Sequence, residues 1–147
     1  MTISIDTNIF AALWNPDEPL SSMVATVLRN LYGKEQLFIC GTVYAELMAG
    51  PLRDELALDM FFMDTGIQVD WNMDEAVIRL AGHSYSEYAD RRRRVGAEAP
   101  GRILADFLIG AHALRSRYSL LTLDTRHFST WFPELSLLSV PDQSSLS

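Results

Sequence analysis

Short apolar runs alternate along the chain with longer stretches that are apolar on one side only. The runs are rich in aliphatic and β-branched residues and predict five strands, at Thr2–Asp6, Leu37–Cys40, Ile67–Val69, Ser119–Leu123 and Leu135–Val140. At least one helical or turn-forming stretch separates each strand from the next. Because buried strands that alternate with helices are typical of parallel sheets, the pattern predicts an α/β fold with helices on both faces.

The stretches between the strands carry apolar residues at helical spacing. They predict helices or helical turns at Asn8–Trp14, at Ser22–Leu31 behind a cap at Ser21 or Ser22, at Val43–Ala49 behind a cap at Thr42, at Leu52–Met63, from Asn72 or Asp74 to Arg94, at Ile103–Leu114 and at Thr125–Trp131. In Leu52–Met63 the side chains at helical spacing are Leu56, Met60 and Met63, and we expect this helix to be mostly core.

Length and composition fit one globular domain spanning residues 1–147, with a flexible tail after about residue 141. The formal net charge is −7, which argues against a protein that binds nucleic acid only by coating its phosphates. It does not exclude a nucleic-acid enzyme, because metal-binding carboxylates add negative charge. Lys34 is the only lysine, so the basic residues are almost all arginines, which suit bidentate contact with phosphate or carboxylate.

Cysteine content and hydropathy bear on the compartment. Cys40 is the only cysteine, so an intrachain disulfide and a cysteine-based zinc site are excluded. No signal-peptide pattern opens the chain, and no apolar run is long enough to span a bilayer. We therefore expect a cytoplasmic protein that has no membrane contact.

Four acidic residues interrupt apolar or small-residue surroundings. Asp6 and Asp124 end predicted strands, Glu46 follows the second strand, and Asp106 lies inside Ile103–Leu114. Asp and Glu are rarely buried without a partner, and the carboxyl ends of parallel strands face one crevice. We interpret the four as one shared site, although each also has an ordinary structural explanation, such as capping by Asp6 or Asp124.

Cationic partners for these carboxylates are few. Arg102 lies one helical turn before Asp106, and Arg126 is close to Asp124. Two arginines cannot neutralise four clustered carboxylates, whereas Mg²⁺ or Mn²⁺ accepts oxygen ligands and keeps waters and substrate phosphates. A divalent ion there would activate water and stabilise the leaving oxygen of a phosphodiester.

Four segments also resemble, in order, the motifs of the PIN-domain ribonucleases, and most closely the VapC-type toxins of toxin–antitoxin pairs. They are Asp6–Phe10, Ala45–Gly50, Asp106–Ala113 and Leu121–Phe128. The resemblance covers nearly the whole chain. The sequence departs from the family pattern at Gly110, where alanine is common, and in the turn at 132–135, where a glycine is common; neither departure touches the acidic residues.

The resemblance implies a three-layer α/β/α sandwich with a parallel five-stranded sheet of order 3-2-1-4-5. It also implies that four acids are the catalytic and metal-binding residues and that three polar residues support them: Asp6, Glu46, Asp106 and Asp124, with Thr7, Asn8 and Thr122. The implied activity is Mg²⁺- or Mn²⁺-dependent endoribonuclease cleavage that leaves a 5′-phosphate and a 3′-hydroxyl. The implied partners are an RNA substrate, a cognate antitoxin and a second copy of the chain.

Other residues invite functional interpretations that we rank lower. Four consecutive arginines, Arg91–Arg94, point in different directions on a helix, so a solvated helix end is favoured over an RNA-binding rim formed with Arg115 and Arg117. His112 and His127 lack partners at zinc-site spacing and are interpreted as structural or supporting. The tryptophans are interpreted as core or interface anchors; they are Trp14, Trp71 and Trp131.

Three alternatives to a toxin ribonuclease remain open. The first is an RNA-processing nuclease outside any toxin–antitoxin pair. The second is a non-catalytic module whose acidic pocket binds a partner's arginines. The third, a phosphoryl-transfer domain with Asp6 as nucleophile, ranks low because it needs a second aspartate at position 8 and a downstream lysine, whereas position 8 is Asn8 and the only lysine is Lys34.

Overall fold

A computed structural model of the chain describes residues 1–51, 54–96 and 103–141. Its centre is a five-stranded sheet of order β3-β2-β1-β4-β5 in which every pairing is parallel. The strands are β1 (Thr2–Ile5), β2 (Gln36–Cys40), β3 (Gln68–Asp70), β4 (Ser119–Leu121) and β5 (Leu137–Leu138). The predicted α/β class and strand order are confirmed.

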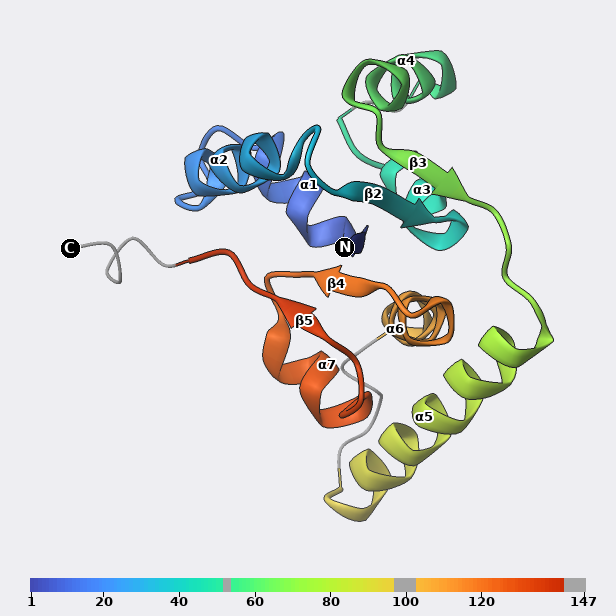
Figure 1. Cartoon of the computed structure of the whole chain (residues 1–147). Coiled ribbons are helices and arrows are strands. Elements are labelled where there is room, and N and C mark those ends of the chain that lie inside the picture. Colours follow the sequence, from blue (N-terminus) through green and yellow to red (C-terminus); the bar gives the residue numbers. More distant parts are fainter. Residues whose placement is uncertain (52–53, 97–102, 142–147) are drawn as a thin grey trace.

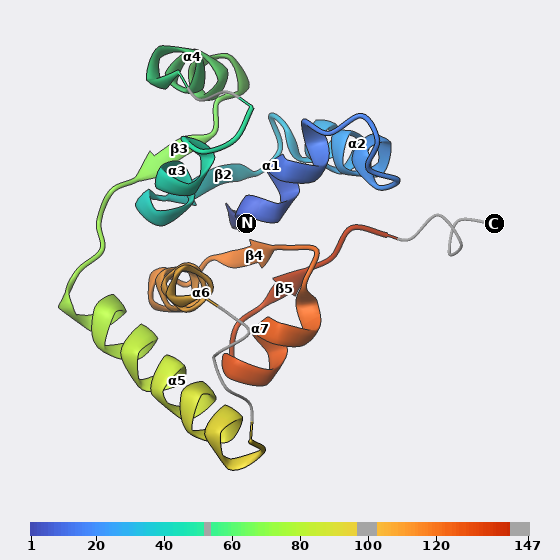
Figure 2. The same cartoon turned by 180° about the vertical axis from the view of Figure 1, so that it is seen from behind.

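The described residues form seven helices, which lie around this sheet (Figures 1 and 2). They are α1 (Thr7–Leu13), α2 (Ser21–Leu31), α3 (Gly41–Leu47), α4 (Glu55–Thr65), α5 (Glu75–Arg94), α6 (Leu104–Ser116) and α7 (Thr125–Trp131). The chain moves outward from β1 to β3 and then crosses back to β4 and β5. Because parallel crossovers are right-handed, this reversal puts α1 to α4 on one face and α5 to α7 on the other.

Aromatic side chains fill the core on both faces of the sheet. On one face, the Phe10 ring of α1 lies 5.9 Å from the Phe62 ring of α4, edge to face. On the other, the ring of Phe107 on α6 packs against the rings of Tyr88 on α5 and Trp131 on α7, which also contact each other. Such edge-to-face packing adds to the area that these rings bury. The two aromatic clusters therefore hold the helices in place on either side of the strands.

Two predicted helix caps are wrong. The structure places Leu20, not a serine, at the cap position of α2, and the Ser21 hydroxyl instead donates to the Leu13 carbonyl oxygen at 3.2 Å. Helix α3 begins at Gly41, directly after the last residue of β2, so Thr42 is already helical. No loop separates the strand from the helix, so the last residue of the strand, Cys40, occupies the cap position. Residue preferences for capping do not predict a cap of this kind.

The prediction of a core face on α4 is also wrong. Leu56, Met60 and Met63 are 66%, 54% and 81% exposed, whereas Leu58 and Phe62 are buried. Both sets have helical spacing, so periodicity alone does not decide which one faces inward. The side of α4 that carries Leu58 and Phe62 is buried because the Phe62 ring packs against Phe10. Residues 52 and 53, where we expected this helix to begin, lie outside the described residues.

The close packing expected at Gly110 is present. A Cβ atom added to Gly110 would lie 2.5 Å from the Phe132 ring, which is itself buried. The ring thus occupies the space that an alanine side chain would need. Phe132 belongs to the turn that departs from the family pattern, so the two departures meet at one contact.

The last two strands in the chain are shorter than predicted. Strand β4 ends at Leu121, and β5 contains only Leu137 and Leu138. Thr122 still donates its backbone N–H to the Leu138 carbonyl oxygen at 3.1 Å. The early end of β4 leaves Thr122 and the next two residues at the edge of the sheet, where their side chains can serve a site. No helix in the described part of the chain is long and apolar enough to cross a membrane.

Candidate active site

Four carboxylates from four separate segments line one cavity. Asp6 and Asp124 occupy the cap positions of α1 and α7, Glu46 lies on α3, and Asp106 lies in the first turn of α6. Together with Thr7, Asn8 and Phe128 they line a cavity of about 260 Å³. The structure therefore brings together every acidic residue that the sequence singled out.

Asp6 is the most buried of these acids, at 4% exposed. It occupies the cap position of α1 without the usual side-chain capping hydrogen bond, although a hydrogen bond from the Thr7 backbone is among those that lower its pKa. Burial raises the pKa of Asp6 to about 6, and the nearby charges of Asp106 and Glu46 add to the increase, against hydrogen bonds that lower it. A carboxylate in this position is stabilised by any cation that enters the cavity.

A hydrogen-bond network centred on Thr122 orients Asp6. The Thr122 hydroxyl donates to Asp6 Oδ2 at 2.7 Å. The hydroxyl oxygen of Thr122 accepts from Asn8 Nδ2 at 3.4 Å and from the Asp124 backbone N–H at 3.0 Å. The Asn8 side-chain carbonyl in turn accepts from the Leu123 backbone N–H at 3.2 Å. One donor and two acceptor positions saturate a hydroxyl, so the orientation of this side chain is fixed.

Glu46 reaches the cavity from the neighbouring helix. The Thr7 hydroxyl donates to Glu46 Oε1 at 2.6 Å, which connects α1 with α3. The bond occupies one carboxylate oxygen and leaves Oε2 for another contact. Thr7 thus has the same relation to Glu46 that Thr122 has to Asp6.

Asp124 has a structural task as well as a place in the cavity. Its Oδ1 accepts from the His127 backbone N–H at 3.4 Å and so caps α7. The capping explanation considered for Asp124 therefore applies in part, beside its place among the acids. The possible pair between Arg102 and Asp106 depends on a residue, Arg102, that lies outside the described part of the chain.

Sequence reasoning missed the apolar wall of the cavity. Phe128, buried in the middle of α7, is its one aromatic lining residue among those the structure describes. It follows His127, whose buried ring packs against Phe107 at 5.2 Å. An apolar residue next to four acids lowers the local polarity and strengthens their interaction with a cation. The only signal in the sequence was the spacing of Phe128, which follows Asp124 by one helical turn and therefore lies on the same side of the helix.

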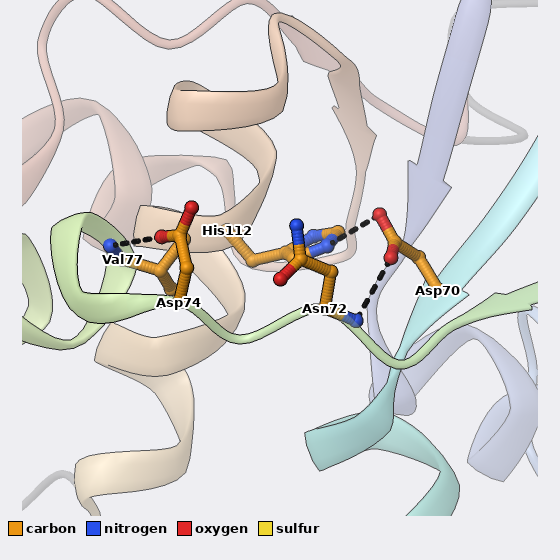
Figure 3. Close-up of polar contacts among 5 residues, drawn as sticks. All are labelled: Asp70, Asn72, Asp74, Val77 and His112. Carbon is orange, nitrogen blue, oxygen red and sulfur yellow. Dashed lines mark hydrogen bonds and ion pairs between the residues drawn. The ribbon is translucent and has the colours of Figure 1, made fainter.

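A second carboxylate at the same edge of the sheet serves a different purpose (Figure 3). Asp70 ends β3, and its Oδ2 lies 3.0 Å from Nε2 of His112, a fully buried residue of α6. The other oxygen of Asp70 accepts from the Asn72 backbone N–H at 3.0 Å. Further along, Asp74 caps α5 by accepting from the Val77 backbone N–H. His112 is thus a structural contact outside the acidic cavity, in line with its interpretation from sequence.

The donor set of the cavity fits a hard divalent cation. All of its polar lining side-chain atoms are oxygens except the amide nitrogen of Asn8, and Mg²⁺ and Mn²⁺ prefer oxygen ligands. Within residues 1–51, 54–96 and 103–141, however, no three His, Cys, Asp or Glu side chains are arranged to hold an ion directly. Mg²⁺ typically binds through one or two carboxylates and retains waters. The arrangement therefore fits an ion with a partly aqueous shell better than one held by four direct ligands.

The PIN domain family model matches residues 3–130 of the chain. The chain belongs to the PIN domain family. PIN domains are nucleases, so at the coarse level the activity is hydrolysis of nucleic acid. A search of curated proteins finds no match.

Solved structures with the same fold come from toxin–antitoxin complexes. VapBC2 of Rickettsia felis, bound to a promoter DNA fragment, has a chain 20% identical to this PIN domain, with a TM-score of 0.63; the match covers 96% of this chain and 100% of that one. VapBC-1 of nontypeable Haemophilus influenzae gives 22% identity and 0.63, covering 95% and 98%. A toxin–antitoxin complex from Klebsiella pneumoniae gives 17% and 0.64, also covering 95% and 98%. At these identities the similarity is one of fold.

Proposed function

We propose that this PIN domain is a Mg²⁺- or Mn²⁺-dependent endoribonuclease, the toxin of a toxin–antitoxin pair. One observation carries the catalytic part of the proposal: Asp6, Glu46, Asp106 and Asp124 line a single cavity although they come from segments far apart in the sequence. Capping alone gives no reason for four such carboxylates to meet. A cation-assisted reaction on a phosphodiester does, because the cation stabilises both the carboxylates and the substrate phosphate.

Asp6 and Asp106 would hold the ion, with Glu46 and Asp124 completing its surroundings directly or through water. When bound, such an ion supplies Lewis-acid stabilisation of the charge that develops on the phosphate. Thr122 keeps Oδ2 of Asp6 in one orientation through its 2.7 Å hydrogen bond, and Thr7 does the same for Glu46. Asn8 holds Thr122 in place in turn. These hydrogen bonds fix the acids before the substrate arrives, which avoids reorganisation during the reaction.

The reaction is an in-line displacement at phosphorus. A water attacks the phosphorus, the bond between phosphorus and the 3′ oxygen breaks, and the products are a 5′-phosphate and a 3′-hydroxyl. The proton that water loses passes to one of the cavity carboxylates, and the 3′ oxygen gains a proton from solvent. Oε2 of Glu46 is the candidate acceptor, because the Thr7 hydroxyl holds the other carboxylate oxygen and so fixes the group.

An antitoxin and a second copy of the chain are the proposed protein partners. The similar structures are complexes of toxins with antitoxins, and this chain offers apolar surface for such contacts. An apolar groove of about 270 Å³ lies between α2 and α4, with Leu28, Tyr32 and Phe61 among its walls. We assign the groove to the antitoxin, because a groove between helices accepts the apolar face of another helix.

A nuclease test decides between this function and a non-catalytic acidic pocket. The purified protein is incubated with a mixture of structured RNAs, with Mg²⁺, with Mn²⁺ and with chelator. We expect cleavage that requires metal and is lost in Asp6→Asn and Asp106→Asn, but not in Asp17→Asn, which changes an exposed aspartate outside the cavity. No cleavage with any metal, together with no metal binding by calorimetry, would contradict the proposal.

The alternative of an RNA-processing nuclease outside a toxin–antitoxin pair shares the chemistry and differs only in partners. Co-expression separates the two. A toxin arrests growth when expressed alone, and a small protein encoded beside it restores growth and co-purifies with it. Growth that continues during expression of an active nuclease would favour the processing enzyme.

A further inference from the structure

An apolar recess with a cationic rim lies at the C-terminal end of α5. Its volume is about 180 Å³, and it is lined by Tyr88, Arg91, Arg92, Val95 and Trp131. Tyr88 is buried, but Val95 is 75% exposed, so an apolar floor opens to solvent. Arg91 and Arg92 belong to its lining, and the Arg91 guanidinium lies against the Trp131 ring. Aromatic side chains next to arginines are a combination that holds single-stranded nucleic acid, with bases against the rings and phosphates at the arginines.

Arg91 is held in place by a ring. Its guanidinium carbon lies 4.6 Å from the centroid of the Trp131 ring, a cation–π contact. Trp131 in turn packs edge to face on Tyr88 at 5.3 Å. An arginine stacked in this way can still donate hydrogen bonds in the plane of the guanidinium. Because the stacking already restricts the side chain, Arg91 loses less conformational entropy on binding than a freely rotating arginine would.

The recess lies within reach of the acidic cavity. Trp131 contacts Phe107, the residue next to Asp106, with ring centroids 6.3 Å apart. Trp131 is also seven residues after Asp124 along α7, which corresponds to about 10 Å at the rise of an α-helix. Figure 1 shows the C-terminal half of α5 beside α7. An RNA strand that crosses the acidic cavity can therefore place a second nucleotide, a few positions along its sequence, on the recess.

The charge distribution favours a phosphate ligand. The chain has a net charge of −7, and the cavity itself is lined by carboxylates, so an RNA strand is repelled unless cations elsewhere hold it. Four of the 12 basic residues are consecutive, Arg91–Arg94. Arg93 pairs with Asp90 on the same helix, and Arg91 and Arg92 line the recess. The ordinary role of arginines at a helix C-terminus explains the run but not the stacked geometry or the apolar floor.

We propose that this recess binds one nucleotide of the single-stranded RNA substrate a few positions from the scissile bond, with the base on Val95 and the edge of Trp131 and the phosphate at Arg91 and Arg92. The proposal rests on the proposed function for the identity of the strand. It assigns a substrate-positioning role to arginines that sequence reasoning had favoured as a solvated helix end.

Binding is measured separately from cleavage. A fluorescein-labelled single-stranded RNA of mixed sequence is titrated with the cleavage-deficient Asp106→Asn protein, and anisotropy is followed at several salt concentrations. The tested variants are Arg91→Gln and Arg92→Gln. The matched control is Arg79→Gln, an exposed arginine of the same helix that pairs with Glu75 and lies outside the recess. Thermal melting of each protein reports whether a substitution affects folding.

We expect Arg91→Gln and Arg92→Gln each to weaken RNA binding about fivefold or more. The slope of log K against log salt should fall in magnitude by about 0.7 for each phosphate that the protein no longer neutralises. In the cleavage-competent protein both variants should raise KM and leave kcat unchanged. Arg79→Gln should match the unsubstituted protein in all three measurements. Arg92→Gln guards against a purely structural effect of Arg91→Gln, since the cation–π contact with Trp131 belongs to Arg91.

The results distinguish failure of this inference from failure of the proposed function. If the protein cleaves RNA but the recess variants match Arg79→Gln in affinity and salt slope, the recess does not bind RNA and the inference is wrong. If the protein cleaves no RNA yet loses RNA affinity in both recess variants, the inference holds and the nuclease proposal fails. A decrease in kcat with unchanged KM would also contradict substrate positioning at this place.

Discussion

Two aspartates at the same edge of the sheet behave differently. Asp6 directly follows β1 and Asp70 is the last residue of β3, so the topology treats them alike. Burial raises the pKa of Asp6, and the charges of Asp106 and Glu46 raise it further, whereas Asp70 lies beside the buried imidazole of His112. A carboxylate among carboxylates is destabilised until a cation arrives; a carboxylate beside a histidine is already satisfied. Burial and neighbouring groups together decide which aspartate is available for chemistry.

Helix α6 supplies the deciding neighbour to both aspartates. Asp106, in its first turn, lines the acidic cavity, and His112, further along, reaches Asp70. One helix therefore carries an acid to one region and a partner for an acid to the other. Substitutions that affect the acidic cavity without affecting the contact between Asp70 and His112, or the reverse, therefore test whether the two aspartates differ in function.

The largest difference is expected between Asp6→Asn and Asp70→Asn. Asp6→Asn removes a candidate metal ligand and should lower kcat/KM by about 10²- to 10³-fold, the size seen when a preorganised charge-stabilising group is lost. Asp70→Asn keeps the shape of the β3 edge and should change activity by less than about twofold, while lowering the unfolding free energy by about 1 kcal/mol. Cleavage assays and urea titrations on both variants check this. Equal loss of activity in the two would break the comparison.

The pH dependence of stability should also separate the two regions. The pKa of Asp6 is raised from 3.8 to about 6, so folding favours its protonated form. In chelator-treated protein, this group therefore stabilises the fold fully below its unfolded pKa of 3.8 and loses that contribution as the pH rises through about 6. A shift of 6 minus 3.8, or 2.2, corresponds to an upper value of about 3 kcal/mol.

The measurement is the unfolding free energy between pH 4 and 7 for the chelator-treated protein and for Asp6→Asn. The difference between the two should grow with pH in favour of the variant, and added Mg²⁺ should reduce it by stabilising the ionised carboxylate of the unsubstituted protein. Asp70→Asn should leave this part of the profile in place. A profile that is the same in Asp6→Asn would mean that Asp6 is not the titrating group.

Gly110→Ala should disturb both regions, because Gly110 lies on α6 between Asp106 and His112. The new Cβ would overlap the Phe132 ring, with 2.5 Å between the atoms, and overpacking of this kind costs about 1–3 kcal/mol. We expect stability to fall by an amount within that range in thermal or urea unfolding. The double variant Gly110→Ala with Phe132→Leu should recover part of the loss. No loss in the single variant would show that α6 can shift freely.

Sequence reasoning reached most of the fold and the composition of the site, for an identifiable reason. Strand alternation and four acidic residues in apolar surroundings are local signals, and the resemblance to PIN domains ordered them. What it missed depends on side-chain contacts across the fold. The buried face of α4 depends on the contact of Phe62 with Phe10, and the different surroundings of Asp6 and Asp70 depend on burial and on residues of α3 and α6. Neither contact has a local pattern in the sequence.

The supporting hydroxyl of Thr122 gives the smallest predicted effect. Thr122→Val removes the hydrogen bond to Asp6 and leaves the Asn8 amide and the Asp124 N–H without this acceptor. We expect kcat to fall about fivefold to tenfold, equivalent to about 1 kcal/mol for one hydrogen bond, with KM unchanged. Thr122→Ser, which keeps the hydroxyl, should restore kcat.

The pH profile of Thr122→Val separates orientation from simple loss of packing. The Thr122 hydrogen bond lowers the pKa of Asp6, so without it the pKa of Asp6 should rise further and the acid limb of the rate profile should move to higher pH. Thr122→Ser should leave that limb in place. An unshifted profile in Thr122→Val would mean that the hydroxyl does not act through Asp6, and the acidic region would then depend on its carboxylates alone.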